Sequence, residues 1–179
     1  QWEMEHFFMR QGYYTLLFND DQQMALMKDT AVTEAVVEKI LLKKNRVTNY
    51  LFQRLKGAWL LKGIRVTSIE ENANASFLKF CQQFAADSAF QVKSLNATVQ
   101  FVGPDPDDDF NMMEGVITPD TWEAFAPTLP AKVLYNIVYG KPQPSGNEKI
   151  FLLRGVANGL ELELRFKCVN GAWKLMSMT

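Results

Sequence analysis

Hydrophobic and charged residues alternate near the carboxy-terminal end of the chain. From residue 160 to 168, every second position is Leu, Phe or Cys, and the positions between them are Glu, Arg or Lys. This period of two predicts an antiparallel strand with one buried and one solvated face. Asn170-Gly171 follows, and this pair favours a tight hairpin turn because both residues tolerate positive φ. We therefore expect a hairpin whose second strand begins near Trp173.

A helical period replaces the alternation between residues 68 and 87. Ser68 and Glu71 have the spacing of a capping box, and Ser76 is an alternative helix start. The residues that follow at spacings of three and four form one apolar stripe: Phe77, Phe80, Cys81 and Phe84. The pattern predicts a helix that ends near residue 87 and buries this stripe.

The segments after this helix carry weaker signals. Alternation predicts a strand over residues 89–102, followed by a loop over 103–113. A short helix is expected to begin over residues 119–122, with Pro119 and either Asp120 or Thr121 as start signals. Two more strands are expected over 133–139 and 150–156. One long helix followed by a run of strands is typical of an α+β fold, here a helix packed in a strongly curved antiparallel sheet.

The four tryptophans suggest an internal repeat. Trp2 and Trp59 bracket one stretch, and Trp122 and Trp173 bracket another of similar length and residue order. An aromatic strand also follows the first Trp of each pair, 12 residues after Trp2 and 13 after Trp122. Duplication of one structural unit explains this order. The alternative is that any antiparallel meander places aromatic residues beside its turns, so the similarity arose by convergence.

The best internal match lies near the end of each unit. Residues 52–61 align without gaps on residues 166–175 and share Phe, Gly, Ala, Trp and Leu. We predict an incomplete first copy over residues 1–67, made mostly of antiparallel strands. Residues 68–179 would then be a complete second copy with its own helix and curved sheet.

Composition excludes several classes of protein. Hydrophobic residues make up 47% of the chain and charged residues 22%, which indicates a folded domain. The formal net charge of -1 gives no field that attracts nucleic acid. No uncharged apolar run approaches the ~20 residues that span a bilayer. The first five residues lack the basic start of a signal peptide, so we expect any export signal to have been removed.

Candidate metal and cofactor sites are weak. His6 is the only histidine, which excludes a cluster of histidine ligands. Residues 105–111 place oxygen-bearing side chains at alternate positions, as a calcium loop does, but Phe110 and Val116 stand where that loop needs Gly and Glu. A solvated acidic turn is the favoured interpretation. Glycine-rich phosphate loops are absent from the sequence, so no cofactor and no metal is predicted.

The two cysteines lie on predicted apolar faces. Cys81 shares the helical stripe, and Cys168 continues the buried face of the last long strand. Such positions favour free core thiols over a disulfide, although a bridge between the two stays an open alternative.

Three parts of the sequence resemble a known family: residues 77–91, Trp122 and residues 166–175. They are similar to an uncharacterised family of secreted Bacteroidetes lipoproteins with the nuclear transport factor 2-like, or cystatin-like, fold. In that fold a helix lies in a cone of bent antiparallel sheet. The resemblance implies a secreted, periplasmic or outer-membrane-anchored protein of the cell envelope, with a lipid anchor upstream of this chain. It implies no defined activity.

The aromatic residues of the predicted cone are the candidates for a ligand pocket, namely Phe80, Phe84, Phe166 and Trp173. Because the inward positions of the last hairpin are all apolar, that wall offers no general base, and no catalytic residue is predicted. A non-catalytic binding or scaffold module is favoured, with a small apolar ligand or a protein as partner. The alternatives are a small isomerase- or dehydratase-like enzyme in the cone of the second copy, or two copies packed as an internal pseudo-dimer.

Overall fold

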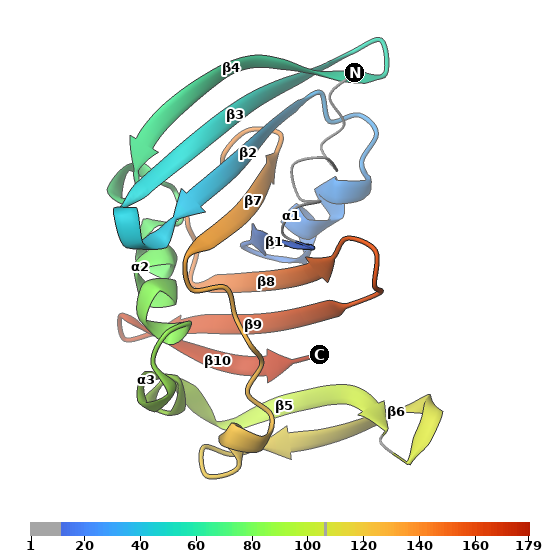
Figure 1. Cartoon of the computed structure of the whole chain (residues 1–179), viewed down its shortest axis with the longest axis vertical. Coiled ribbons are helices and arrows are strands. Elements are labelled where there is room, and N and C mark those ends of the chain that lie inside the picture. Colours follow the sequence, from blue (N-terminus) through green and yellow to red (C-terminus); the bar gives the residue numbers. More distant parts are fainter. Residues whose placement is uncertain (1–11, 106) are drawn as a thin grey trace.

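The computed structural model describes residues 12–105 and 107–179, and within them ten strands form two sheets (Figure 1). The six-stranded sheet has the order β1-β8-β9-β10-β5-β6, and the four-stranded sheet has the order β4-β3-β2-β7. The strands are β1 (Tyr13–Phe18), β2 (Glu34–Leu41), β3 (Arg46–Leu55), β4 (Ala58–Ser68), β5 (Leu95–Asp105), β6 (Asp108–Ile117), β7 (Val133–Tyr139), β8 (Glu148–Gly155), β9 (Glu161–Val169) and β10 (Ala172–Met178).

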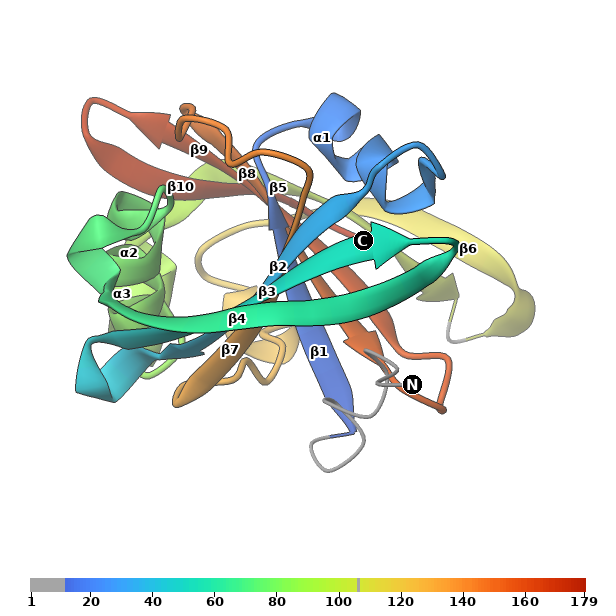
Figure 2. The same cartoon turned by 90° about the horizontal axis from the view of Figure 1, so that it is seen from above.

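Short helices cover the ends of the sheets. They are α1 (Asp21–Ala25), α2 (Ala75–Phe84) and α3 (Ser88–Lys93), with the single turns η2 (Leu26–Lys28), η3 (Leu42–Lys44), η4 (Ile69–Glu71) and η5 (Trp122–Ala124). Figure 2 shows α2 and α3 together at one end of the strands, whereas α1 lies away from them. The α+β class predicted from the sequence is confirmed. The strands form two sheets, and their pairing is antiparallel as predicted except between β10 and β5, which run parallel.

The helical region differs from its prediction at both ends. Ser68 and Glu71 do form the capping box, but it caps only η4, and α2 begins at Ala75, close to the alternative start. The strand expected from residue 89 begins only at Leu95. The reason is a second helix cap, since the Asp87 carboxylate accepts a hydrogen bond from the Phe90 amide at 3.0 Å and starts α3.

The loop expected over residues 103–113 is also wrong. β5 continues to Asp105, and β6 returns beside it as the outer strand of the six-stranded sheet. Its acidic residues hid the strand signal, because they are solvated on an edge rather than alternating with buried positions. The strands predicted near the carboxy terminus are confirmed, and β7 has the expected bounds.

The main core lies between α2 and the six-stranded sheet. The rings of Phe77 and Phe166 are 5.1 Å apart at their centroids, and Phe77 is equally close to Trp173. Burial of each such side chain contributes about 1.5 to 3 kcal/mol relative to exposure in water. A second core packs Leu16 and Phe18 of β1 against Val37 and neighbouring residues of the four-stranded sheet. The two cores together join both sheets into one body.

Two hairpins of the molecule share one geometry. The β3–β4 turn is Lys56-Gly57, with φ of 51° and 78°, and the β9–β10 turn is Asn170-Gly171, with φ of 50° and 78°. Both have the positive φ pair of a type I′ turn. In both, the register shifts at the same distance from the turn, so that Lys62 and Met176 are the extra residues of equivalent bulges.

Strand pairing crosses the division predicted at residue 67. β1 pairs with β8 in one sheet, and β2 pairs with β7 in the other. Each sheet therefore contains strands from both sides of that division. Trp2 lies outside the described residues, so the first half of the predicted repeat stays a prediction.

Candidate functional site

A row of polar residues crosses the four-stranded sheet. Asn136 on β7 lies opposite Glu38 on β2, which lies opposite Asn49 on β3, and Asn49 lies opposite Arg65 on β4. Residues directly opposite each other in paired strands project from the same face, so these four side chains form one line. The first three are buried, and Arg65 is exposed. Three adjacent polar residues inside a sheet require a specific set of hydrogen bonds.

Glu38 is the centre of this row and is only 6% exposed. One carboxylate oxygen accepts a hydrogen bond from Asn136 Nδ2 at 2.8 Å, and the other accepts one from Asn72 Nδ2 at 2.6 Å. Burial raises the pKa of Glu38, and the two amide hydrogen bonds oppose that rise only in part. Within the described residues, no salt bridge reaches this carboxyl group.

Backbone amides fix the orientation of the side-chain amides of Asn136 and Asn72. The Leu17 amide of β1 donates to Asn136 Oδ1 at 2.8 Å, and the Asn74 amide donates to Asn72 Oδ1 at 2.8 Å. Because a backbone N–H is always a donor, each side-chain oxygen must face it, and each NH₂ group must face Glu38. Both oxygens of Glu38 are therefore held as acceptors, and the carboxyl group has a fixed orientation.

A cavity of about 290 Å³ opens beside Glu38. The polar row forms one wall of this cavity, together with Asn72. Asn19 after β1, Tyr139 at the end of β7 and Gln143 in the loop that follows also line it. Ligand pockets commonly measure ~300 to 1,000 Å³, so this one suits a small molecule. We name it the Glu38 cleft.

The four residues predicted to line a pocket lie together, but in the core around α2. Phe80 and Phe84 each lie 5.5 Å from the Phe166 ring at their centroids, and Trp173 Nε1 donates a hydrogen bond to Ser76 Oγ at 3.1 Å. The cavity beside Phe84 and Phe166 measures about 10 Å³, room for about one water molecule. These side chains fill the space between helix and sheet with one another.

The residues of the Glu38 cleft were not predicted from the sequence. Glu38 follows Val36-Val37, and two adjacent apolar residues conceal which strand face is buried. A usable signal was present in Asn136, a single amide between Tyr135 and Ile137 in an otherwise apolar strand. An isolated polar residue in a buried strand needs partners, and here the partner is the carboxyl group on the neighbouring strand.

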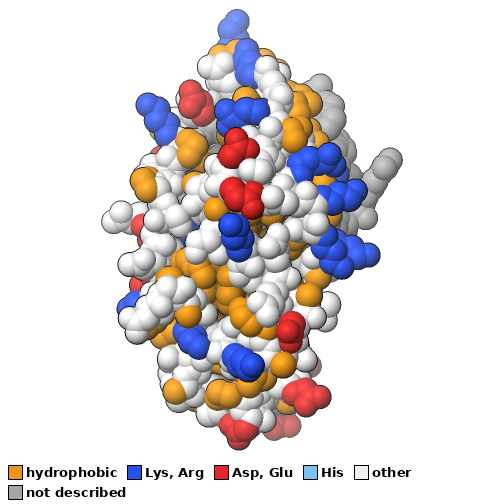
Figure 3. Space-filling view, turned by 90° about the vertical axis from the view of Figure 1, so that its left-hand side faces the viewer, with side chains coloured by type: hydrophobic (Ala, Val, Ile, Leu, Met, Phe, Trp, Pro, Cys, Tyr) orange, Lys and Arg blue, Asp and Glu red, His pale blue; other side chains and the backbone are white. Residues whose placement is uncertain are grey.

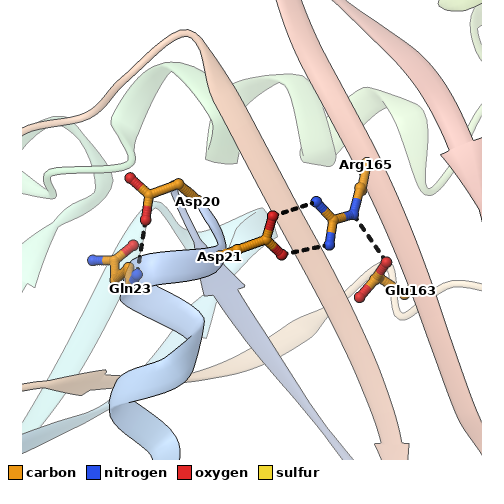
Figure 4. Close-up of polar contacts among 5 residues, drawn as sticks. All are labelled: Asp20, Asp21, Gln23, Glu163 and Arg165. Carbon is orange, nitrogen blue, oxygen red and sulfur yellow. Dashed lines mark hydrogen bonds and ion pairs between the residues drawn. The ribbon is translucent and has the colours of Figure 1, made fainter.

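A second polar cluster joins α1 to β9 (Figure 4). The Arg165 guanidinium donates to both carboxylate oxygens of Asp21, at 2.7 and 3.1 Å, and to Glu163 at 2.9 Å. These contacts raise the pKa of Arg165 and lower that of Asp21. Asp20 caps α1 through the Gln23 amide at 2.7 Å. The cation makes three hydrogen bonds to two carboxylates, which is typical of a structural clamp.

Lys149 on β8 is a buried cation of a different kind, with 1% of its surface exposed. Its Nζ donates a hydrogen bond to Asn19 Oδ1, a neutral acceptor. Burial lowers the pKa of Lys149 to about 8. Asn19 also borders the Glu38 cleft, so this residue joins the buried lysine to the wall of the cavity.

Other predicted features lie apart from the cleft. Cys81 and Cys168 are free thiols, and burial raises the pKa of Cys81. Within residues 12–105 and 107–179, no group of three or more His, Cys, Asp and Glu side chains is placed to hold a metal ion. No helix in the same part of the chain is long and apolar enough to cross a membrane. His6 lies outside the described residues.

Comparisons with known proteins place this geometry in a family. A crystal structure of a nuclear transport factor 2-like protein from Bacteroides fragilis NCTC 9343 matches with a TM-score of 0.84 and 41% sequence identity. The match covers 99% of this chain and 77% of that one. No curated protein matches. The whole chain, residues 1–179, matches the domain of unknown function DUF4348, and the protein therefore belongs to that family.

Proposed function

We propose that this protein is a binding module that holds a small polar ligand in the Glu38 cleft. The observation that carries the proposal is the buried carboxyl group of Glu38, which two asparagines hold in a fixed orientation beside a cavity of about 290 Å³. A buried acid without a cation is costly, so a protein of marginal stability retains one mainly where it serves a function.

The chemistry of the cleft favours a ligand with N–H or O–H donors. Each Glu38 oxygen accepts one amide hydrogen bond and has a second lone pair for a ligand donor. A ligand ammonium group would also form the ion pair that no described residue makes with Glu38. At the same time, Arg65 and Gln143 border the cavity and offer donors to ligand oxygens.

An enzyme is the second candidate, and Glu38 again supports it. A raised pKa in a cleft is typical of a general base or acid, as an isomerase or dehydratase requires. We favour binding because the phenol that borders the cleft, Tyr139, is a poor general acid. Burial raises the pKa of Tyr139, so it gives up its proton less readily to a reacting group. The two candidates differ in outcome, because an enzyme must convert a bound molecule and a binding module releases it unchanged.

A screen by ligand-observed NMR tests the binding proposal. Small amines, amino sugars, neutral sugars and carboxylates serve as probes against the wild type, Glu38→Gln and the matched control Glu163→Gln on β9. We expect amines or amino sugars to bind the wild type and Glu163→Gln, and to bind Glu38→Gln at least about ten-fold more weakly. Binding that is equal in all three proteins would remove Glu38 from the site. Spectra recorded after incubation identify any product and would favour the enzyme.

We also propose a location in the cell envelope. The resemblance of residues 77–91, Trp122 and residues 166–175 to secreted lipoproteins supports it. Fractionation of cells that express the full precursor, followed by mass spectrometry of its amino terminus, tests this location. A lipidated Cys in the membrane fraction is expected, and an unprocessed chain in the cytosol would contradict it.

A duplicated unit is the proposed origin of the fold. The equal registers, turns and bulges of the β3–β4 and β9–β10 hairpins support it. The strand order supports it as well. β1 of the first copy lies beside β8-β9-β10 of the second copy, and β7 of the second copy lies beside β2-β3-β4 of the first copy. Under this proposal the two copies form an interlocked pseudo-dimer, and the Glu38 cleft lies where one copy contributes Asn136 to the sheet of the other.

A further inference from the structure

The β5–β6 hairpin carries an unusual distribution of charge. From Ser94 to Ala131 the sequence contains no Lys, Arg or His, whereas it contains seven acidic residues: Asp105, Asp107, Asp108, Asp109, Glu114, Asp120 and Glu123. The whole chain has a net charge of only -1, so the remainder is basic by comparison. Red side chains are visible at the lower end of the molecule in Figure 3, which is the end of this hairpin in Figure 1.

Hydrophobic side chains are exposed on the same hairpin. Phe110 is 97% exposed, and Met112 and Val116 are each more than half exposed. These residues lie at alternate positions of β6, and Ile117 faces the core, so the three project from the outer face of the strand. Contiguous apolar side chains on a solvent-exposed face are typical of an interaction site.

β6 is also the last strand of its sheet. It pairs with β5 on one side only, and no other described strand lies beyond it. Its outer edge therefore presents backbone N–H and C=O groups that a further strand can pair with. Native edges are commonly protected by Lys, Pro or a bulge. Residues 108–117 include neither Lys nor Pro, and the register irregularity of this hairpin lies at its turn, between Pro104 and Asp105 of β5.

We infer that β6 is a docking edge for an extended, basic segment of another protein, in which Lys or Arg alternates with apolar residues. Backbone pairing with β6, apolar contact with Phe110 and Met112, and attraction to the acidic hairpin would each contribute. The charge argues against the other occupants: a second copy would bring acidic strands together, and nucleic acid or an anionic membrane would be repelled. This surface is separate from the Glu38 cleft and does not depend on its function.

The test uses the full chain and three synthetic ten-residue peptides. The first alternates Lys and Val, the second alternates Glu and Val, and the third is the Lys-Val peptide with a central Pro. Fluorescence anisotropy measures the affinities, and hydrogen exchange measures the protection of the β6 amides. We expect the Lys-Val peptide to bind at least about ten-fold more tightly than either control, to protect β6, and to weaken strongly between 50 and 500 mM salt.

Two protein variants make the test specific. The double variant Met112→Lys/Glu114→Lys changes the outer face of β6 and should weaken binding of the Lys-Val peptide about ten-fold or more. Glu123→Lys changes the net charge in η5, off the strand, and should weaken it by less than about three-fold. Circular dichroism and thermal unfolding verify that both variants fold.

Several outcomes would overturn the inference. There is no docking at β6 if the Lys-Val peptide leaves the hydrogen exchange of the β6 amides unchanged. The attraction is one of diffuse charge if the Glu-Val peptide binds with equal affinity, or if both variants lose affinity for the Lys-Val peptide equally. There is also no docking if the Lys-Val peptide does not bind at 1 mM. Protection of β6 that rises with protein concentration alone would assign the edge to a second copy of the chain.

Discussion

Glu38 shows how one buried group links local geometry to function. Both of its oxygens are held as acceptors, yet burial raises its pKa, so the folded protein carries an acid that resists ionisation. A group whose pKa is raised by folding stabilises the protein at low pH, and that stability is lost as the pH rises through the folded pKa.

The substitution Glu38→Gln tests this linkage. We expect the variant to gain stability relative to the wild type as the pH rises through the folded-state pKa of Glu38, because Gln does not ionise. Urea unfolding of both proteins at pH values from 4 to 9 gives the difference in free energy. A difference that is independent of pH would contradict the assignment, and Glu34→Gln, at an exposed carboxylate of the same strand β2, serves as the control.

Lys149 predicts a pH dependence in the alkaline range. Its pKa falls from 10.5 to about 8 on folding. The unfolded chain therefore binds more protons between these values, so the stability of the wild type rises with pH there. At 1.36 kcal/mol for each pKa unit, the rise is up to about 3 kcal/mol. Lys149→Met should lack it when the two unfolding curves are compared from pH 7 to 10.5, and a parallel rise in both proteins would contradict the account.

At the scale of single residues, the sequence predicted the core better than the cleft. The helical spacing of Phe77, Phe80 and Phe84 was sufficient to place them in the core, because periodicity reports burial directly. Glu38 and Asn136 come from strands almost 100 residues apart. Their contact depends on the pairing of β2 with β7, which no local pattern encodes.

At the scale of elements, the turns of the β3–β4 and β9–β10 hairpins allow a test of their equivalence. Gly57 and Gly171 both have φ of 78°, and at either position a Cβ would meet no atom within 4 Å. The cost of Gly57→Ala and of Gly171→Ala is therefore backbone strain alone, about 1 to 2 kcal/mol each. Chemical denaturation should give similar losses for both variants. Clearly unequal losses would contradict the equivalence of the two hairpins.

At the same scale, the aromatic packing of α2 predicts how much stability a core ring contributes. Phe84→Ala should cost about 3 to 5 kcal/mol, because it removes a buried ring that packs against Phe80 and Phe166 and leaves a cavity. Phe110→Ala, at an exposed ring on β6, is the matched control and should change the free energy of unfolding by less than about 0.5 kcal/mol. Equal effects would place Phe84 outside the core.

Elements with strong local signals were predicted, and those fixed by distant contacts were not. The last hairpin follows from strict alternation and an Asn-Gly turn. β6 was missed because an exposed edge strand does not alternate, and α3 was missed because Asp87 starts a second helix directly after the first. The parallel pairing of β10 with β5 depends on how α2 and α3 carry the chain across the molecule.

At the scale of the whole molecule, the crossed pairing makes the two halves depend on each other. Without β8 the strand β1 has no partner, and without β7 the strand β2 loses one side of its ladder and Asn136 leaves Glu38. We expect separate fragments 1–67 and 68–179 to be unfolded and to regain native circular dichroism when mixed. Two fragments that each fold alone would contradict this interdependence.

The cleft depends on the same arrangement, since Asn136 on β7 reaches Glu38 on β2 within one sheet, while the Leu17 amide of the other sheet orients Asn136. The central claim is that this assembly buries an acid without a neutralising cation. Titration of the Glu38 side-chain carboxyl by carbon-13 NMR measures its pKa directly. We predict a value above 4.5, the ordinary value for Glu. A value at or below 4.5 would mean that the surroundings compensate the charge, and the proposed ligand site would lose its basis.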